Sequence, residues 1–209
     1  MTMTESTDAT GAGTPATTPA ARRRMTTTDL ALVAAFAALT GAVAYLGGVP
    51  VGGAGVAITL QTFAIMLAGA VLGPLRGFAA ASLYLAMGAV GLPVFSQHAS
   101  GLAPFTGVSA GYLISFPLAA LLVGALVKYA AGPRWKTSAL VVFGCAMAGT
   151  ALVNHPMGIV GMSIHQDVSL ATAATWDAPF WLGDILKNAL VALVAAEVHR
   201  AFPQLLHRR

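Results

Sequence analysis

Long apolar runs dominate the hydrophobic pattern of this chain, and short segments rich in glycine, proline and basic residues separate them. No Asp, Glu, Lys or Arg occurs within residues 30–75 or within residues 77–127. Apolar runs of this length predict helices that cross a membrane. The breaks divide the chain into six predicted spans: residues 29–46, 58–73, 76–91, 108–129, 137–157 and 179–200. The predicted fold class is therefore an all-α integral membrane protein, a bundle of six transmembrane helices with structured loops beside the short second and third spans.

The two ends of the chain differ from this membrane domain. The first 21 residues are mostly Thr, Ala, Gly and Pro, and such a segment cannot bury enough apolar surface to become ordered. We predict a disordered tail over residues 1–28, the six-helix domain over 29–200 and a short basic tail over 201–209. Arg22–Arg24 and the small residues Ala42 and Ala44 imitate a cleaved signal peptide. We expect no cleavage, because the first span of a polytopic protein already inserts the chain.

Composition narrows the class of protein further. Of the 209 residues, 57% are hydrophobic and only 9% are charged, against about 25% charged in soluble domains. So few charges cannot make a solvated surface, which excludes a cytosolic enzyme and, despite a pI of about 9.6, a nucleic-acid partner. Cys145 is alone and lies in an apolar run, which excludes a disulfide-stapled secreted domain.

The basic residues predict the orientation of the bundle. Six spans place both termini on one side of the membrane, and ten of the eleven basic residues fall on that side: Arg22, Arg23, Arg24, Arg76, Lys128, Arg134, Lys136, Arg200, Arg208 and Arg209. The opposite loops, at 47–57, 92–107 and 158–178, contain no Lys or Arg. By the positive-inside rule both termini, and hence both tails, are expected to be cytoplasmic.

Two charges lie inside the sixth predicted span, where topology does not explain them. Asp184 and Lys187 are three residues apart and share a helix face, at expected depths of roughly 8 and 12 Å from the outer end. A charge within the membrane costs at least about 2.5 kcal/mol on insertion scales. The pair either neutralises itself or supplies an acceptor and a donor to a small polar ligand, and we favour the ligand.

Small and flexible residues mark two further surfaces. On the first span they recur at spacings of three and four: Ala31, Ala34, Ala35, Ala37, Ala38 and Gly41. Close approach through small side chains drives helix association in lipid, so this face either packs within the bundle or receives another subunit. At the outer ends of the spans, glycines from Gly88 to Gly111 accompany Phe95, Gln97, His98 and Tyr112. Irregular backbone at membrane depth lines a cavity or is buried, which predicts an outward-facing pocket near Asp184.

Four segments of the chain together resemble one known family. They are ITLQTFAIMLAGAVLGPLRG (58–77), LYLAMGAVGLPVFS (83–96), GVSAGYLISFPLAALLVG (107–124) and PFWLGDILKNALVALVA (179–195). In this order they are similar to the BioY family, the substrate-binding S component of the energy-coupling-factor biotin transporter. The resemblance implies a multi-pass protein of the bacterial plasma membrane that binds biotin near the extracellular face.

The resemblance also implies which residues contact biotin. In the family, the Asp and Lys of the GD-x-x-K block bind the ligand, and these are Asp184 and Lys187 here. A polar side chain follows the GLPVF block in the family, and this chain offers Gln97 and His98 at that place. Aromatic and polar side chains that could complete the pocket are Tyr84, Phe95, Tyr112, Trp181 and Gln61.

Partners follow from the same resemblance. The chain has no G-x-x-x-x-G-K-[ST] phosphate loop, so we expect that it does not hydrolyse ATP. The resemblance implies two ATPase subunits or domains and one transmembrane coupling subunit, with docking through Ala31, Ala34, Ala35 and Ala38 of the first span. Some members of the family are proposed to work without a dedicated energy-coupling module, and the sequence leaves both cases open.

Other interpretations stay open from the sequence. An S component for another vitamin, of the thiamine or riboflavin class, would share the scaffold. Gly107 to Gly111 matches the G-x-S-x-G nucleophile elbow around Ser109, and with His155 it would suit an intramembrane serine hydrolase, although no strand precedes it. The histidines have no metal-ligand spacing, and they are His98, His155, His165, His199 and His207. We expect no metal and no cofactor besides the ligand.

Overall fold

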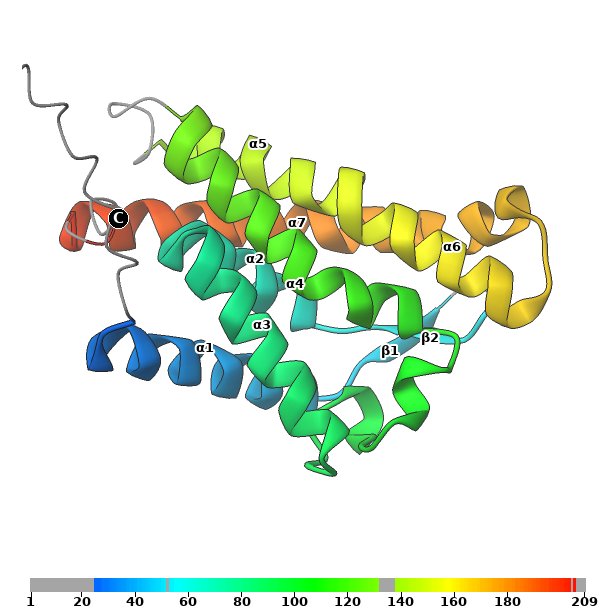
Figure 1. Cartoon of the computed structure of the whole chain (residues 1–209). Helices are drawn as coiled ribbons and strands as arrows, with labels where there is room; N and C mark the ends of the chain where they lie inside the picture. Colours follow the sequence, from blue (N-terminus) through cyan, green and yellow to red (C-terminus); the bar gives the residue numbers. More distant parts are fainter. Residues whose placement is uncertain (1–24, 52, 132–137, 204, 206–209) are drawn as a thin grey trace, which may run out of the picture.

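A computed structural model describes residues 25–51, 53–131, 138–203 and 205 of the chain. Within these ranges it contains six helical rods, two of them with an internal change of helix type (Figure 1). The helical segments are α1 (Thr27–Tyr45), α2 (Gln61–Leu72), α3 (Pro74–Ala89), α4 (Ala110–Ala125), α5 (Ala139–Gly149), α6 (His155–Gln166) and α7 (Leu170–Ala201). The expected six-helix bundle is confirmed.

The first four helices lie within a few residues of their predicted bounds. Thr26 caps the start of α1, because its hydroxyl accepts from the backbone N–H of Asp29 while the Asp29 carboxylate accepts from the N–H of Thr26. Gly73, with φ of +81°, separates α2 from α3, and Pro74 opens α3, where a missing N–H costs nothing. The tail predicted over 1–28 lies outside the described residues as far as residue 24, and α1 already includes Thr27.

The last two rods are longer than predicted. Residues 139–166 form one continuous rod, because a π-helical turn, η4 (Thr150–Asn154), joins α5 to α6. Helix α7 begins at Leu170 rather than at residue 179, so Pro179 lies inside it. The loop expected at 158–178 is therefore mostly helix, and Asp184 lies about 21 Å along α7 instead of roughly 8 Å from its outer end.

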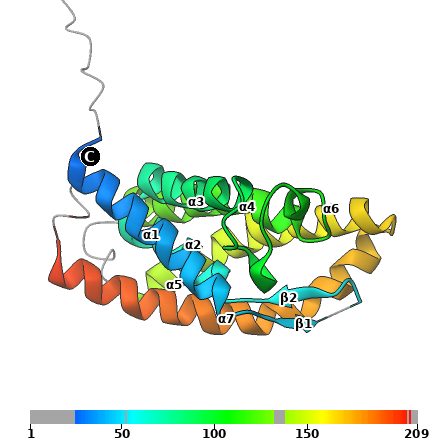
Figure 2. The same ribbon diagram turned by 90° about the horizontal axis from the view of Figure 1, so that it is seen from below.

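Structured loops adjoin the two short helices, as expected. An antiparallel hairpin that the sequence analysis did not predict, β1 (Val49–Val51) paired with β2 (Val56–Ile58), precedes α2. After α3 come two 3₁₀ turns, η1 (Ser96–His98) and η2 (Ala103–Phe105). Figure 2 shows the hairpin beside α7, toward the end of the molecule where α6 turns into α7, and a Cβ on Gly53 between its strands would lie 2.2 Å from Nε1 of Trp176 in α7. The loops thus form a cap at one end of the bundle.

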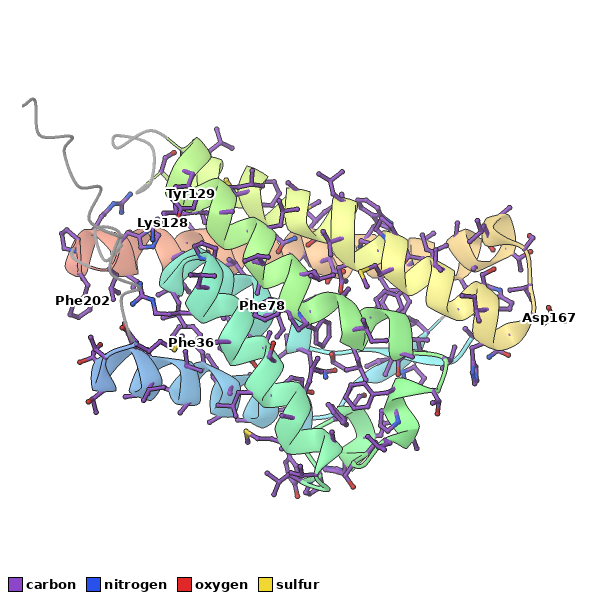
Figure 3. The ribbon with its side chains drawn as sticks, in the orientation of Figure 1. Phe36, Phe78, Lys128, Tyr129, Asp167 and Phe202 are labelled. Atoms are coloured by element: carbon purple, nitrogen blue, oxygen red, sulfur yellow. The ribbon has the colours of Figure 1, made fainter. Side chains whose placement is uncertain are left out.

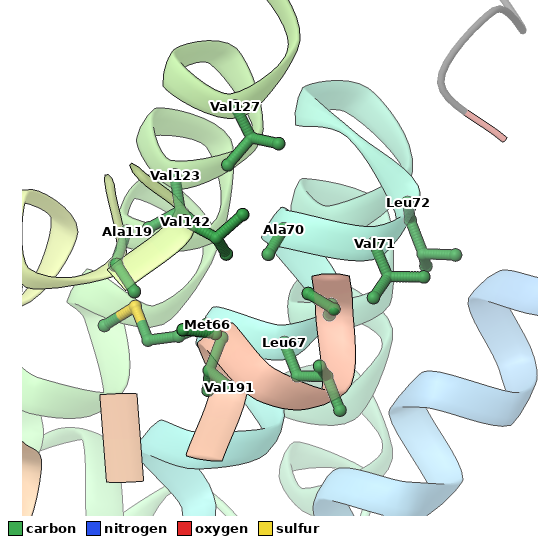
Figure 4. Close-up of a cluster of buried hydrophobic side chains, with 14 of the residues drawn as sticks. Met66, Leu67, Ala70, Val71, Leu72, Ala119, Val123, Val127, Val142 and Val191 are labelled. Atoms are coloured by element: carbon green, nitrogen blue, oxygen red, sulfur yellow. The ribbon is translucent and has the colours of Figure 1, made fainter. Parts of the chain in front are cut away.

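The core at the other end is made of small aliphatic side chains. Helix α2 is buried almost all round, between α1, α3, α4, α5 and α7. Figure 4 shows Met66, Ala70, Val123 and Val142 packed together in this cluster, with Val191 of α7 beside them. A Cβ on Gly69 would lie 2.4 Å from the carbonyl oxygen of Ala120, so α2 and α4 touch backbone to backbone. Such close packing through small residues is typical of helices in membranes.

The two ends of the molecule differ in charge. Figure 3 places Lys128 and Phe202 at one end and Asp167 at the other. An ion pair of 3.1 Å between Arg76 and Asp29 also lies at the first end, where it joins the start of α3 to the start of α1.

Among the described residues, four helices are long and apolar enough to cross a membrane: 27–45, 110–129, 139–166 and 170–201. The longer rods leave the number of crossings unchanged, so the fold is consistent with the predicted partition of basic residues.

Candidate functional site

A cavity of about 460 Å³ lies under the loop cap, between the starts of α2 and α4 and the middle of α7. Its volume is in the range of small-molecule sites. The wall is mostly apolar, and its polar members include Thr59, Gln61, Thr62, Gln97, Ser109, Asn154, Asp184 and Lys187. Phe95, Tyr112, Phe116 and Phe180 supply aromatic surface. Most of the predicted pocket residues therefore meet in one place.

Asp184 and Lys187 form an ion pair in the wall of this cavity. Nζ of Lys187 lies 2.5 Å from Oδ1 of Asp184, and both side chains are largely buried. The same ammonium donates to the carbonyl oxygen of Thr59 at 3.1 Å and to Oγ1 of Thr62 at 2.8 Å. Thr62 in turn donates to Oδ1 of Asp184 at 2.9 Å. These contacts hold one strong acceptor and one strong donor at the cavity surface.

Behind Asp184 lies a second buried carboxylate that the sequence analysis missed. Asp177 is 1% exposed, and its Oδ1 lies 2.7 Å from Nδ1 of His155. Oη of Tyr112 donates to that oxygen at 2.5 Å, and Nε1 of Trp181 donates to Oδ2 at 3.0 Å. Asp177 and Asp184 are seven residues apart, which places them on one face of α7 two turns apart. This spacing was the available signal, and the loop expected at 158–178 concealed it.

A second polar network supports the wall near the start of α2. Nε2 of Gln61 donates to Oη of Tyr84 at 2.5 Å, and Tyr84 donates to the carbonyl oxygen of Val94 at 3.0 Å. Tyr84 itself is fully buried and packs edge to face on Phe95. A Cβ on Gly88 would lie 2.1 Å from Cζ of Phe95, so glycine at this position lets the ring enter the wall.

Two of the predicted wall residues lie outside the cavity lining. Tyr84 lies behind Phe95 and Gln61 and contacts both of these lining residues, Phe95 through its ring and Gln61 through its hydroxyl. Trp181 packs against His155, with ring centroids 4.3 Å apart and planes 7° apart, and 36% of it is exposed. Tyr84 therefore supports residues that line the cavity, whereas Trp181 contacts His155 and Asp177, which lie behind that lining.

The alternatives at positions 97 and 98 separate in the structure. Gln97 lines the cavity, whereas the His98 ring packs edge to face on Tyr45 with centroids 4.3 Å apart. Both residues have positive φ, of 56° and 60°, a conformation that is uncommon for residues other than glycine. The loop after the GLPVF block therefore directs the amide, and not the imidazole, to the cavity.

The geometry around Ser109 does not match a nucleophile elbow. Ser109 is the residue before α4, and a 3₁₀ turn rather than a strand precedes it. The ring nitrogens of His155 face Asp177 and Asp184 instead. A serine hydrolase needs its histidine within hydrogen-bond reach of the serine, so the hydrolase hypothesis has no geometric support.

The small residues of α1 lie at the surface. Ala31, Ala34, Ala35 and Ala38 are exposed, whereas Ala37 and Gly41 are buried against the rest of the bundle. The helix therefore uses one face for internal packing and leaves a stripe of small side chains exposed on the other face.

In the described chain, no group of three or more His, Cys, Asp or Glu side chains has an arrangement that could hold a metal ion.

Comparisons with known proteins agree with this architecture. The model of the BioY family matches residues 17–204. A biotin transporter BioY from Rhodobacter capsulatus is 35% identical over 190 residues, which cover 87% of this chain and 98% of that protein. Another from Rhizobium etli is 33% identical with the same coverages.

A solved structure has the same fold. It is the crystal structure of the S-component for biotin from an ECF-type ABC transporter, with a TM-score of 0.74 and 27% identity. The match covers 85% of this chain and 95% of that chain. The resemblance that the four sequence segments indicated is thus confirmed along nearly the whole described chain, and the protein belongs to the BioY family.

Proposed function

We propose that this protein captures biotin in the cavity under its loop cap, as the S component of an energy-coupling-factor transporter in a bacterial membrane. The observation that carries the proposal is the Asp184–Lys187 pair, which lies in the wall of an otherwise largely apolar cavity of small-molecule size. Family membership and the names of the relatives described above support it.

The chemistry of the cavity matches the chemistry of biotin. The ureido ring of biotin has two N–H donors and one carbonyl acceptor, its thiophane ring is apolar, and its tail ends in a carboxylate. Asp184 accepts from a ureido N–H and Lys187 donates to an acceptor, both in charge-assisted hydrogen bonds. Phe95, Tyr112 and Phe180 pack on the apolar ring system. Gln61 and Gln97 are further polar contacts in this proposal.

Partners complete the proposed function. The chain has no phosphate-binding loop, so the energy for transport comes from two ATPase subunits and a transmembrane coupling subunit. The coupling subunit meets the exposed stripe of Ala31, Ala34, Ala35 and Ala38 on α1. Small residues allow the close helix contacts that hold membrane subunits together.

Isothermal titration of the purified protein with biotin, thiamine and riboflavin tests the ligand. We expect binding of biotin and none of the other two vitamins. Binding of thiamine or riboflavin in its place would support the alternative, an S component for another vitamin, and would overturn the assignment of biotin.

A double variant, Asp184→Asn with Lys187→Met, tests the site. Hydrogen bonds to charged groups contribute about 1.5 to 3 kcal/mol each, so loss of two lowers biotin affinity roughly 10²-fold to 10⁴-fold. Asp167→Asn, an exposed residue in the loop before α7, is the matched control and keeps full affinity. Wild-type affinity in the double variant would place the site elsewhere.

A further inference from the structure

His155 lies between two buried carboxylates. Its Nδ1 is 2.7 Å from Oδ1 of Asp177. Its Nε2 is 3.3 Å from Oδ2 of Asp184, but the geometry of this second contact is not that of a hydrogen bond. The three side chains are almost fully buried, at 1 to 4% exposure. Both ring nitrogens therefore face negative oxygen at short range, and no solvent screens these contacts.

A neutral imidazole does not suit this position. It has one protonated nitrogen and one bare lone pair, so one carboxylate would face a lone pair. An imidazolium has a proton on each nitrogen and attracts both oxygens. It also balances the cluster, in which Asp177 and Asp184 are negative and Lys187 and His155 are positive. Balance is important here because an uncompensated buried charge is strongly destabilising.

The neighbours of His155 fit a cation. The indole of Trp181 stacks on the imidazole with centroids 4.3 Å apart, and tryptophan is the ring that binds cations best. Tyr112 and Trp181 each donate to Asp177, so they fix that carboxylate without neutralising it.

Asp184 depends on His155 for one of its two oxygens. Oδ1 accepts from Thr62 and pairs with Lys187, whereas Oδ2 faces His155. Without the imidazolium, only the contacts at Oδ1 would hold the carboxylate, and Oδ2 would be free to leave the orientation that it has at the cavity wall.

We propose that His155 is a positioning residue, an imidazolium that bridges Asp177 and Asp184 and orients the Asp184 carboxylate toward the ligand. The inference rests on the proposed function only for the identity of the ligand. With this role for His155, the site extends beyond the residues that line the cavity. It includes His155, Asp177 and the half-exposed indole of Trp181.

Charge-paired variants test the role in binding. His155→Gln leaves the two carboxylates opposed by Lys187 alone and lowers biotin affinity about 10-fold to 100-fold. Adding Asp177→Asn restores the balance of charge, so the double variant binds at least about threefold more tightly than His155→Gln. His165→Gln, an exposed histidine at the other end of α6, is the control and changes nothing. A double variant as weak as His155→Gln, or weaker, would show a packing role and overturn the inference.

The protonation state is measured without any ligand. In protein labelled with ¹⁵N-histidine, the signals of His155 are those that disappear in the His155→Gln, Asp177→Asn double variant, and we expect them to show both ring nitrogens protonated at neutral pH. A His155 with one unprotonated nitrogen would overturn the inference even if biotin binds. If wild-type protein binds no biotin but His155 is an imidazolium, the proposed function fails while the charged bridge stands.

Discussion

At the scale of single residues, glycine at position 158 sets the place of the Tyr112 ring. A Cβ at this position would lie 2.1 Å from Cε1 of Tyr112. The ring has little freedom to move away, because its hydroxyl donates to Asp177 and the ring stacks on Phe180. Gly158 of α6 therefore leaves the space that the Tyr112 ring occupies in the cavity wall.

Gly158→Ala should weaken both the fold and the site. Overpacking of this kind costs about 1 to 3 kcal/mol, and displacement of Tyr112 removes part of the cavity wall. We expect a lower thermal midpoint and weaker biotin binding by titration. Gly144→Ala in α5 is the matched control, because its Cβ would meet no atom within 4 Å. Equal behaviour of the two variants would contradict this account of Tyr112.

A sequence reveals site residues most clearly where their chemistry differs from that of the residues around them. Asp184 and Lys187 can be identified because charged residues are rare inside an apolar run, and ligand binding explains their presence there. Asp177 and His155 are harder to identify, because the sequence places them in a predicted loop and at a helix end, where polar groups need no explanation. The seven-residue spacing of Asp177 from Asp184 gains meaning only once both residues lie on one helix. Only the course of the backbone shows that they meet in one cluster.

At the scale of elements, the π-helical turn η4 gives the rod of residues 139–166 an extra residue in its middle. Pro156 follows at the start of α6 and has no N–H for the carbonyl four residues earlier. Turns of this type are frequent at functional sites. Here the turn directs Asn154 to the cavity and His155 to the carboxylates.

Deletion of Leu152, an exposed residue within η4, should be tolerated better than most deletions in a membrane helix. Removing one residue from a π turn yields regular α-helix, whereas removal from an α-helix rotates all that follows by about 100°. We expect the Leu152 deletion to elute as a folded protein in gel filtration. Deletion of Val160, also exposed but in regular helix α6, is the comparison. The reverse order of stability would refute this role of η4.

Helix α1 carries the prediction about the partner subunit. In the double variant Ala34→Leu with Ala38→Leu, two leucines replace the smooth stripe and prevent close helix contact. Uptake of labelled biotin by cells should be lost, while the purified variant keeps its affinity for biotin. Ala86→Leu, an exposed small residue on α3, should leave uptake intact. Normal uptake in the double variant would exclude this face as the docking surface.

Glycine and proline predict the ends of the first four helices correctly, but proline misleads in the sixth span. The pattern indicates Pro179 as the first helical residue, whereas α7 has already made more than two turns before it. Proline inside a membrane helix is tolerated when neighbouring groups satisfy the freed backbone. The hairpin β1–β2 escapes prediction because three-residue strands carry too little alternation to stand out from a loop.

At the scale of the whole molecule, three of the described basic residues, Arg76, Lys128 and Arg200, lie toward the end that holds the start of α1 and the end of α7 (Figures 1 and 3). In the sequence, ten of the eleven basic residues fall on the side of the membrane that this end is predicted to face. This asymmetry predicts that both termini are cytoplasmic. A fluorescent protein that folds only in the cytoplasm, fused after Arg209, should fluoresce. A phosphatase that is active only outside the cytoplasm should be inactive at the same position. Activity of the phosphatase fusion would reverse the orientation of the bundle.

The helices differ in length, so the apolar surface that meets the lipid is taller on one side of the protein than on the other. Helix α7 is about 48 Å long, whereas α3, which exposes Leu75, Phe78 and Leu83, is only about 24 Å long. The hydrocarbon core of a bilayer is about 30 Å thick, so lipid beside α3 must thin while α7 tilts or projects. Each ångström of such hydrophobic mismatch costs a fraction of a kcal/mol. We therefore expect the protein to thin the membrane on one flank and to gather lipids with shorter acyl chains there.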